Sequence, residues 1–164
     1  MNDFTVTIPL DVAFDWYQLG KRVISKEPVY CYNLQTNEFM KIKGELKENC
    51  IPFINSYAVC CDVIDQYLEL PHIKKYKEDC LKSIKNGRYR NKIVDFLWFF
   101  EHIDGCMEFG DFEIVLLTKI LKKWCKKNGF SYLDAEVYVV EGNYSDTWGR
   151  TFFESFHPLK KNNF

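Results

Sequence analysis

The sequence predicts an α+β fold, because a β-hairpin pattern near the N-terminus is followed by several segments of helical periodicity and then by a valine-rich run. We expect an N-terminal helix and the hairpin first, and a helical middle of about four helices next. A late C-terminal strand follows that could join the hairpin's sheet. Residues 1–164 are expected to form a single domain, with residues 158–164 as a frayed tail.

The N-terminal helix is predicted over residues 10–19. Pro9 suits a first helical turn, and Gly20 is placed to end the helix. Helical spacing relates the apolar residues Val12, Ala13, Trp16 and Leu19. These side chains are therefore expected to form the apolar face of the helix.

The β-hairpin is predicted from two strands, over residues 29–34 and 39–43, that flank the polar turn 35–38. Asn37 in this turn tolerates the left-handed backbone conformation that glycine adopts most readily. Apolar and aromatic side chains occur on both faces of the first strand. We therefore expect the hairpin to pack against other residues on both sides.

Four helices are predicted between the hairpin and the late strand. Asn55 and Ser56 offer an N-cap for the first, which extends through residue 68. The second, over 71–86, has a Lys-rich outer face. The third, over 91–102, is apolar almost all round, so we expect it to be the central buried helix, with Trp98 in the core.

The fourth of these helices is predicted over residues 111–128. Asp111 can cap it, lysines crowd its last turns, and Gly129 follows as a terminating residue. Beyond it, the valine-rich segment 135–141 predicts the late strand.

The charge balance excludes a whole-chain affinity for nucleic acid or for an acidic membrane. The sequence has 22 Lys and Arg against 23 Asp and Glu, a formal net charge of −1. Its apolar runs fall short of the ~18 residues that a membrane span needs, and the N-terminus lacks the pattern of a secretory signal. We therefore expect a cytoplasmic protein.

Seven cysteines cannot all pair within one chain, and most occupy apolar patterns, so we expect them to be reduced. No CxxC motif occurs and the three histidines are far apart, which argues against a structural zinc site. Glycine-rich phosphate-binding motifs and a Gly-x-Ser-x-Gly nucleophile motif are also missing. We therefore predict neither a cofactor nor a metal, and no motif supports enzyme chemistry.

Two basic runs could bind a phosphate backbone if they lay on one face. Each run combines several cations with an aromatic residue, an arrangement found in nucleic-acid-binding proteins. Lysines at a helix end also stabilise the helix dipole and solvate its surface, which is the structural alternative. The residues are Lys82, Lys85, Arg88, Tyr89, Arg90 and Lys92 in the first run, and Lys119, Lys122, Lys123, Lys126 and Lys127, with Trp124 among them, in the second.

Asp95 interrupts the otherwise apolar third helix. A buried carboxylate needs a partner, which could be a Lys, an Arg, a Tyr hydroxyl or a backbone donor. A structural pair is favoured over catalysis. The enzyme alternative is a carboxylate-based hydrolase that combines Asp95 with His102 or Asp62.

Three segments resemble motifs of a bacterial family, the uncharacterised protein family 0158. The hairpin segment 32–38, the basic segment 87–90 and the helix end 124–129 match these motifs in order and spacing, over about residues 10–132. Asn37 stands where the family's turn has glycine, and residues 91–93 lack the family's second arginine and the phenylalanine that follows it. The resemblance implies the order of the elements and carries no activity.

These observations favour a small cytoplasmic domain that is non-catalytic and acts through protein binding. A nucleic-acid-associated module that uses the two basic runs is an alternative from a different class, and the carboxylate-based hydrolase is a third. One contiguous positive face would favour the nucleic-acid alternative.

Overall fold

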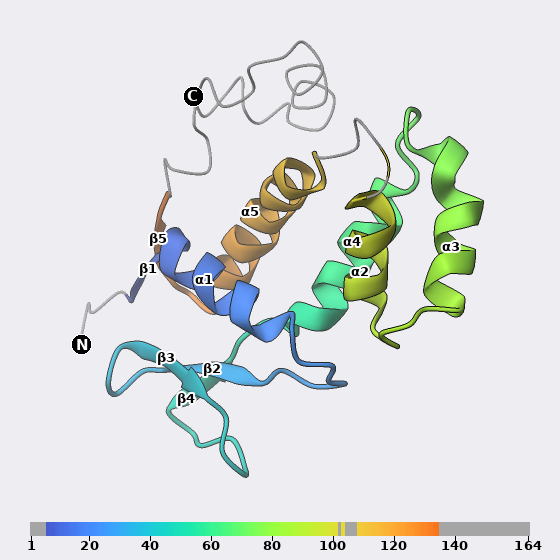
Figure 1. Cartoon of the computed structure of the whole chain (residues 1–164). Coiled ribbons are helices and arrows are strands. Elements are labelled where there is room, and N and C mark those ends of the chain that lie inside the picture. Colours follow the sequence, from blue (N-terminus) through green and yellow to red (C-terminus); the bar gives the residue numbers. More distant parts are fainter. Residues whose placement is uncertain (1–5, 102, 104–107, 135–164) are drawn as a thin grey trace.

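Helices and short strands alternate along the chain, and the α+β class is confirmed (Figure 1). A computed structural model describes residues 6–101, 103 and 108–134. The elements are β1 (Thr7–Pro9), α1 (Leu10–Gly20), β2 (Tyr30–Asn33), β3 (Glu38–Lys41), β4 (Cys50–Pro52), α2 (Ser56–Tyr67), the 3₁₀ helix η1 (Lys74–Tyr76), α3 (Lys77–Lys85), α4 (Lys92–Glu101), α5 (Phe109–Lys127) and β5 (Ser131–Leu133).

β1 and β5 form a parallel two-stranded sheet in which Thr7 lies opposite Ser131. β5 belongs to this sheet and not to the hairpin's sheet, and it precedes the late strand that the sequence predicts. The reason is local, because Gly129 has a φ of 72° and turns the chain after α5 back beside β1. The strand predicted over residues 135–141 and the tail 158–164 lie outside the described residues.

The buried face of α1 differs from the predicted one. Its core-facing residues are Leu10, Ala13, Phe14 and Tyr17. Val12 and Leu19, in contrast, are 39% and 49% exposed. The prediction is confirmed for Ala13 and wrong for Val12 and Leu19, because α1 has apolar side chains on two faces, and the face with the two large rings removes more apolar area from water.

The predicted hairpin is confirmed as β2 and β3, and β4 adds a third strand that the sequence analysis missed. β2 is the middle strand, with Tyr32 between Phe39 of β3 and Ile51 of β4. Asn37 adopts a φ of 57°, as its place in the turn requires. The side-chain oxygen of Asn33 accepts hydrogen bonds from the backbone N–H groups of Gln35 and Thr36 in the turn.

α4 is not the central buried helix that its composition predicts. Trp98 is 48% exposed, and Val94 and Leu97 on the same side are exposed as well. The buried side of α4 contains Phe96 and Phe100, which pack in the core. One side of a helix cannot bury every apolar residue that α4 has, so the others stay at the surface. Composition alone therefore overstated how deeply this helix is buried.

α5 occupies the centre instead, where it packs against α1 and α2 (Figure 1). It begins at Phe109, so Asp111 lies in its first turn and is not the cap that the sequence predicts. The earlier start is explained by Phe109, which is buried against the ring of Tyr67. The predicted helix end is confirmed, with Gly129 just beyond it.

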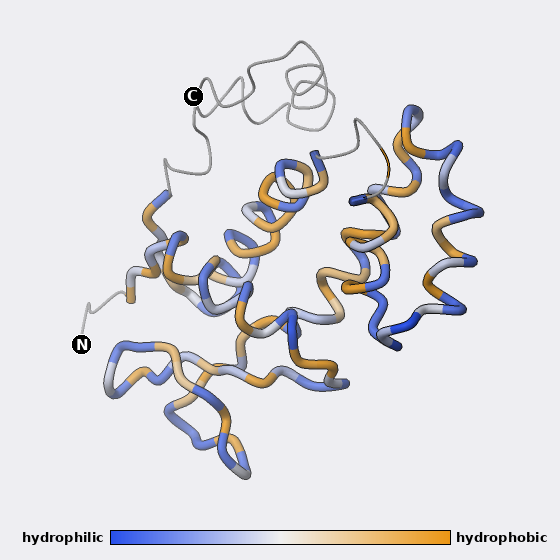
Figure 2. The backbone as a smooth tube through the Cα atoms, viewed as in Figure 1, coloured by the Kyte–Doolittle hydropathy of each residue, from blue (hydrophilic) through white to orange (hydrophobic). Residues whose placement is uncertain are grey.

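Two aromatic clusters hold the elements together. In Figure 2 hydrophobic and hydrophilic stretches alternate along the helices. One cluster joins α2, α4 and α5 through Tyr67, Phe96, Phe100, Phe109 and Phe112. The other joins α1, the three-stranded sheet and α5 through Trp16, Tyr32, Phe39, Phe53, Trp124 and Phe130.

Candidate functional site

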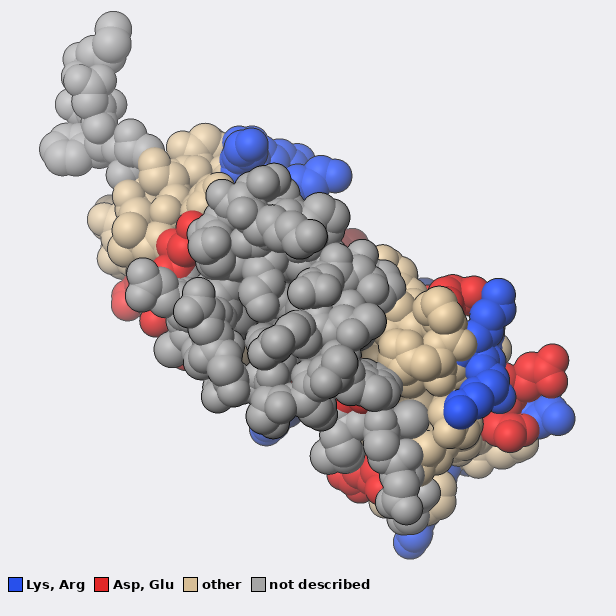
Figure 3. All heavy atoms as spheres, turned by 90° about the horizontal axis from the view of Figure 1, so that it is seen from above, with Lys and Arg blue, Asp and Glu red and all other residues tan. Residues whose placement is uncertain are grey.

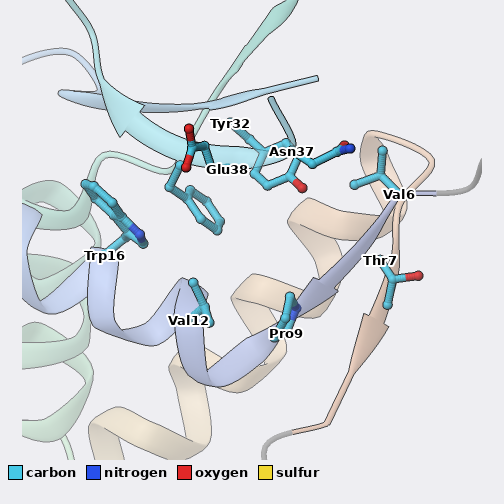
Figure 4. Close-up of a pocket in the computed structure, with 9 residues that line it drawn as sticks. Val6, Thr7, Pro9, Val12, Trp16, Tyr32, Asn37 and Glu38 are labelled. Carbon is cyan, nitrogen blue, oxygen red and sulfur yellow. The ribbon is translucent and has the colours of Figure 1, made fainter. Parts of the chain in front are cut away.

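A groove opens between α1, β1 and the β2–β3 hairpin (Figure 4). Its volume is about 580 Å³, within the range of ligand-binding pockets in proteins. Figure 4 shows Pro9, Val12 and Trp16 on one side, facing the hairpin residues on the other. The lining residues are Val6, Thr7, Pro9, Val12, Trp16, Tyr32, Asn37, Glu38 and Phe39.

The groove accounts for the second apolar face of α1. Val12 and Trp16 are one helical turn apart and both line it. The Trp16 ring lies edge-on to Tyr30, with 4.9 Å between ring centroids, and stacks on Phe39 at 5.9 Å. Two residues of the apolar set predicted for α1, Val12 and Trp16, therefore border this groove, and Trp16 also packs against the core.

The hairpin side of the groove is anchored in the core. Phe39 contacts the rings of Phe53 and Trp124, with centroid distances of 5.1 and 6.1 Å. The indole Nε1 of Trp124 donates a 3.0 Å hydrogen bond to the backbone oxygen of Pro52 in β4. These contacts fix the hairpin relative to α5, so the groove is preformed.

Two strand edges border the groove. Within the described part of the chain, β1 pairs with β5 alone and β3 with β2 alone, and both strands contribute lining residues. An edge strand presents unpaired N–H and C=O groups that a further strand can bind. Each of these two strands therefore has one edge that is unpaired within the described part of the chain.

One acidic residue, Glu38, lines the groove, and a second, Asp15, is exposed on α1 outside the lining. Neither carboxylate forms an ion pair with another described residue. An occupant with basic side chains next to apolar ones would complement both features.

The structure places the two basic runs on separate elements. Figure 1 shows α2 between α3, where the first run begins, and α5, which carries the second. On the face in Figure 3, the Lys and Arg side chains stand in separate groups, and acidic side chains lie beside the group at the right. The exposed members are Lys82, Lys85, Arg88, Tyr89 and Arg90 in the first run, and Lys123, Lys126 and Lys127 in the second, while Lys92, Lys119 and Lys122 are half-buried.

Two of the half-buried lysines have acidic partners. Lys92 pairs with Asp65 at 2.7 Å, and Lys122 pairs with Asp134 at 2.9 Å. Lys122 also lies over the ring of Tyr132. Lys92 and Lys122 thus stabilise neighbouring parts of the fold through these contacts. The two basic runs lie on different elements and do not form one surface.

Asp95 is buried, with 3% of its surface exposed, and it accepts hydrogen bonds from the backbone N–H groups of Tyr89 and Asn91, both at 3.2 Å. A Cβ atom at Gly87 would overlap the Asp95 carboxylate, so glycine is required there. The carboxylate thus holds the loop between α3 and α4. Of the two proposed hydrolase partners, Asp62 is exposed on α2, and His102 lies outside the described residues.

A buried polar cluster that sequence reasoning missed centres on Glu113 of α5. This carboxylate accepts a 2.6 Å hydrogen bond from the Tyr17 hydroxyl, pairs with the Lys21 ammonium at 3.0 Å, and receives the Cys60 thiol at 3.4 Å. Burial and the nearby carboxylate raise the pKa of Cys60 to about 12, so this thiol stays protonated and is no nucleophile at neutral pH. The available signal was that Glu113 comes four residues after Phe109 and shares its core-facing side.

Glu108 is a second buried carboxylate at the start of α5. It accepts a 2.6 Å hydrogen bond from the Tyr67 hydroxyl, and His72 Nε2 lies 3.5 Å from the same oxygen. Glu108 and Glu113 therefore bind α2 and α1 to α5. Neither carboxylate lines the groove.

Among the described residues, no three His, Cys, Asp or Glu side chains gather as ligands for a metal, and no helix is long and apolar enough to cross a membrane. Comparison with protein-family models, curated proteins and solved structures found no match. The resemblance to family 0158 therefore stays a prediction, and the groove must be interpreted from its own geometry.

Proposed function

We propose that this protein is a binding module that holds an extended segment of a partner protein in the groove between α1, β1 and the β2–β3 hairpin. The observation that carries the proposal is the second apolar face of α1, because Val12 and Trp16 line the groove together with residues of β1 and β3, two strands that each pair on one side only among the described residues. A folded protein has no structural need for an apolar groove of this size at its surface. Proteins that bind an extended peptide use both an apolar groove and an unpaired strand edge.

The bound segment adds to the free edge of β1 or β3 by main-chain hydrogen bonds and directs alternate side chains onto Val12 and Trp16. The carboxylates of Asp15 and Glu38 attract Lys or Arg side chains of the same segment. The proposed partner is therefore an extended peptide with apolar residues at alternate positions and basic residues between them.

A cytoplasmic and non-catalytic role belongs to the same proposal. The six described cysteines are all free, which is usual for proteins in a reducing compartment. The buried carboxylates Asp95, Glu108 and Glu113 bind backbone or side-chain donors that hold helices and loops in place. These contacts support a structural use of all three carboxylates, including Asp95, which the sequence offers for a hydrolase.

Selection from a library of random peptides displayed on phage tests the proposal. Selected peptides should alternate apolar residues with Lys or Arg, and their affinity can be measured by fluorescence anisotropy. Val12→Asp should weaken binding by about tenfold or more, because it places a charge on the apolar side of the groove and costs about 1.4 kcal/mol.

Val94→Asp is the matched control. Val94 is 40% exposed, against 39% for Val12, and each valine is the third residue of its helix, α4 and α1 respectively. An acidic residue suits the first turn of both helices, so both variants should fold. Peptides that bind Val12→Asp as tightly as the parent, or a selection without binders, would contradict the proposal.

A further inference from the structure

Three sulfur-containing side chains share one face of the three-stranded sheet. Cys31 of β2 lies opposite Met40 of β3, and Cys50 of β4 lies opposite Asn33. Cys31 and Asn33 are two residues apart on β2, so they point to the same face, and each shares that face with its partner. Cys31, Met40 and Cys50 therefore converge from three adjacent strands.

The three side chains also line one small hollow, with a volume of about 90 Å³, beside the loop after β3. Cys31 and Cys50 are free thiols, only 2% and 7% exposed, and they are close enough to form a hydrogen bond with each other. Asn33 Nδ2 donates to the Met40 sulfur at 3.4 Å and orients this thioether. The hollow shares no lining residue with the groove.

We propose that Cys31, Cys50 and Met40 bind one Cu(I) ion. Thiolate and thioether are soft ligands, and a site that combines them selects Cu(I) among the common metal ions. Zn²⁺ needs more nitrogen, oxygen or thiolate ligands than this site holds, since no three His, Cys, Asp or Glu gather within the described residues. Mg²⁺ and Ca²⁺ require oxygen ligands.

Binding involves no oxidation or reduction. Cu⁺ displaces the protons of both thiols, so two protons are released, two thiolates bind the ion, and the Met40 sulfur donates a lone pair. The complex carries a net charge of −1, which the ammonium groups of Lys41, Lys43 and Lys47 around the hollow offset and Glu45 opposes. Because two protons are released on binding, Cu(I) affinity falls as the pH is lowered.

Transfer of Cu(I) from its bicinchoninate complex under anaerobic conditions tests the site. The loss of the complex's colour should correspond to one equivalent of Cu(I) taken up by the full chain. Cys31→Ser and Cys50→Ser should each abolish this uptake, and Met40→Leu should weaken it by about tenfold or more. Met40→Leu conserves volume, so it keeps the test valid if a cysteine variant fails to fold.

Cys61→Ser is the control, because Cys61 is half-buried on α2 and away from the sheet. This variant should take up Cu(I) as the parent does, and X-ray absorption of the loaded parent should show sulfur ligands only. Uptake below one equivalent, or uptake that survives replacement of both Cys31 and Cys50, would overturn the proposal.

Discussion

The Tyr17 hydroxyl donates a 2.6 Å hydrogen bond to Glu113 and so joins α1 to α5 across 96 positions of the sequence. Lys21, one turn after Tyr17, supplies the positive charge that this buried carboxylate needs, at 3.0 Å. α1 thus presents two polar groups to one carboxylate, and the pairing sets the rotation of α1 about its axis. With the buried Leu10, Ala13 and Phe14, this pairing keeps Tyr17 on the core side of α1, and Val12 and Trp16 lie on the side that lines the groove.

Tyr17→Phe should lower the free energy of unfolding by about 1.5–3 kcal/mol, because it removes a hydrogen bond to a buried charged group and leaves the carboxylate short of a donor. Urea denaturation measures the change. Tyr30→Phe is the control, since the half-buried Tyr30 hydroxyl forms no hydrogen bond with the described residues. The Tyr17 prediction fails if the two variants lose the same small amount.

Stability should fall as the pH rises above about 9. Burial raises the pKa of Cys60 and of Cys80 from the ordinary 9.0 to about 12. The unfolded chain loses these protons first, so the stability that the two thiols contribute is complete below pH ~9 and is lost as the pH rises toward 12. Each thiol adds a slope of about 1.4 kcal/mol per pH unit within that window.

Urea denaturation of the parent and of Cys80→Ala at several pH values between these limits checks this effect. The variant should start less stable, because a buried side chain is truncated, but its stability should decline less steeply with pH. Equal slopes for parent and variant would show that Cys80 ionises alike in the folded and unfolded chain.

Gly87→Ala should destabilise the protein by about 1–3 kcal/mol, because the new Cβ overlaps the Asp95 carboxylate that holds the loop between α3 and α4. Gly110→Ala is the opposite case. A Cβ at Gly110 meets open space within α5, so alanine there should stabilise by about 0.5–1 kcal/mol through its better helix propensity. Thermal denaturation of both variants should show shifts of opposite sign, and a neutral Gly87→Ala would refute the close approach.

The features that the sequence predicts correctly depend on neighbours along the chain. The Asn55 side chain caps α2 by accepting a hydrogen bond from the backbone N–H of Ala58. Asn37 adopts the left-handed backbone conformation that its turn requires. Gly129 follows α5 because glycine readily adopts the positive φ, here 72°, at which a helix ends. Caps, turns and helix ends are local chemistry, so the residue types suffice to place them.

The features that were missed depend on distant residues. β1, β4 and β5 are short strands of three residues each, and their pairing partners lie elsewhere in the chain. Trp98 and Val12 belong to helices with more apolar residues than one buried face can hold, so tertiary packing decides which of them stay exposed. The groove results from that choice, and no periodicity in the sequence marks it.

The nucleic-acid alternative leads to a further prediction, because the two basic runs lie on separate elements and Lys92 and Lys122 have acidic partners. The parent protein should bind labelled single- and double-stranded oligonucleotides weakly or not at all at low salt, as measured by fluorescence anisotropy. Its net charge of −1 provides no long-range attraction to a polyanion.

The second basic run provides the decisive variant. Replacing Lys122, Lys123, Lys126 and Lys127 together by glutamine should cost about 1–2 kcal/mol of stability, since Lys123, Lys126 and Lys127 are exposed and favour the dipole of α5, while Lys122 loses its pair with Asp134. If the run instead contacts phosphates, the parent binds tightly and the variant loses that binding. The slope of affinity against salt then flattens, because each lost contact releases about one counterion fewer. Tight, salt-sensitive binding of this kind would favour nucleic acid over an extended peptide as the partner.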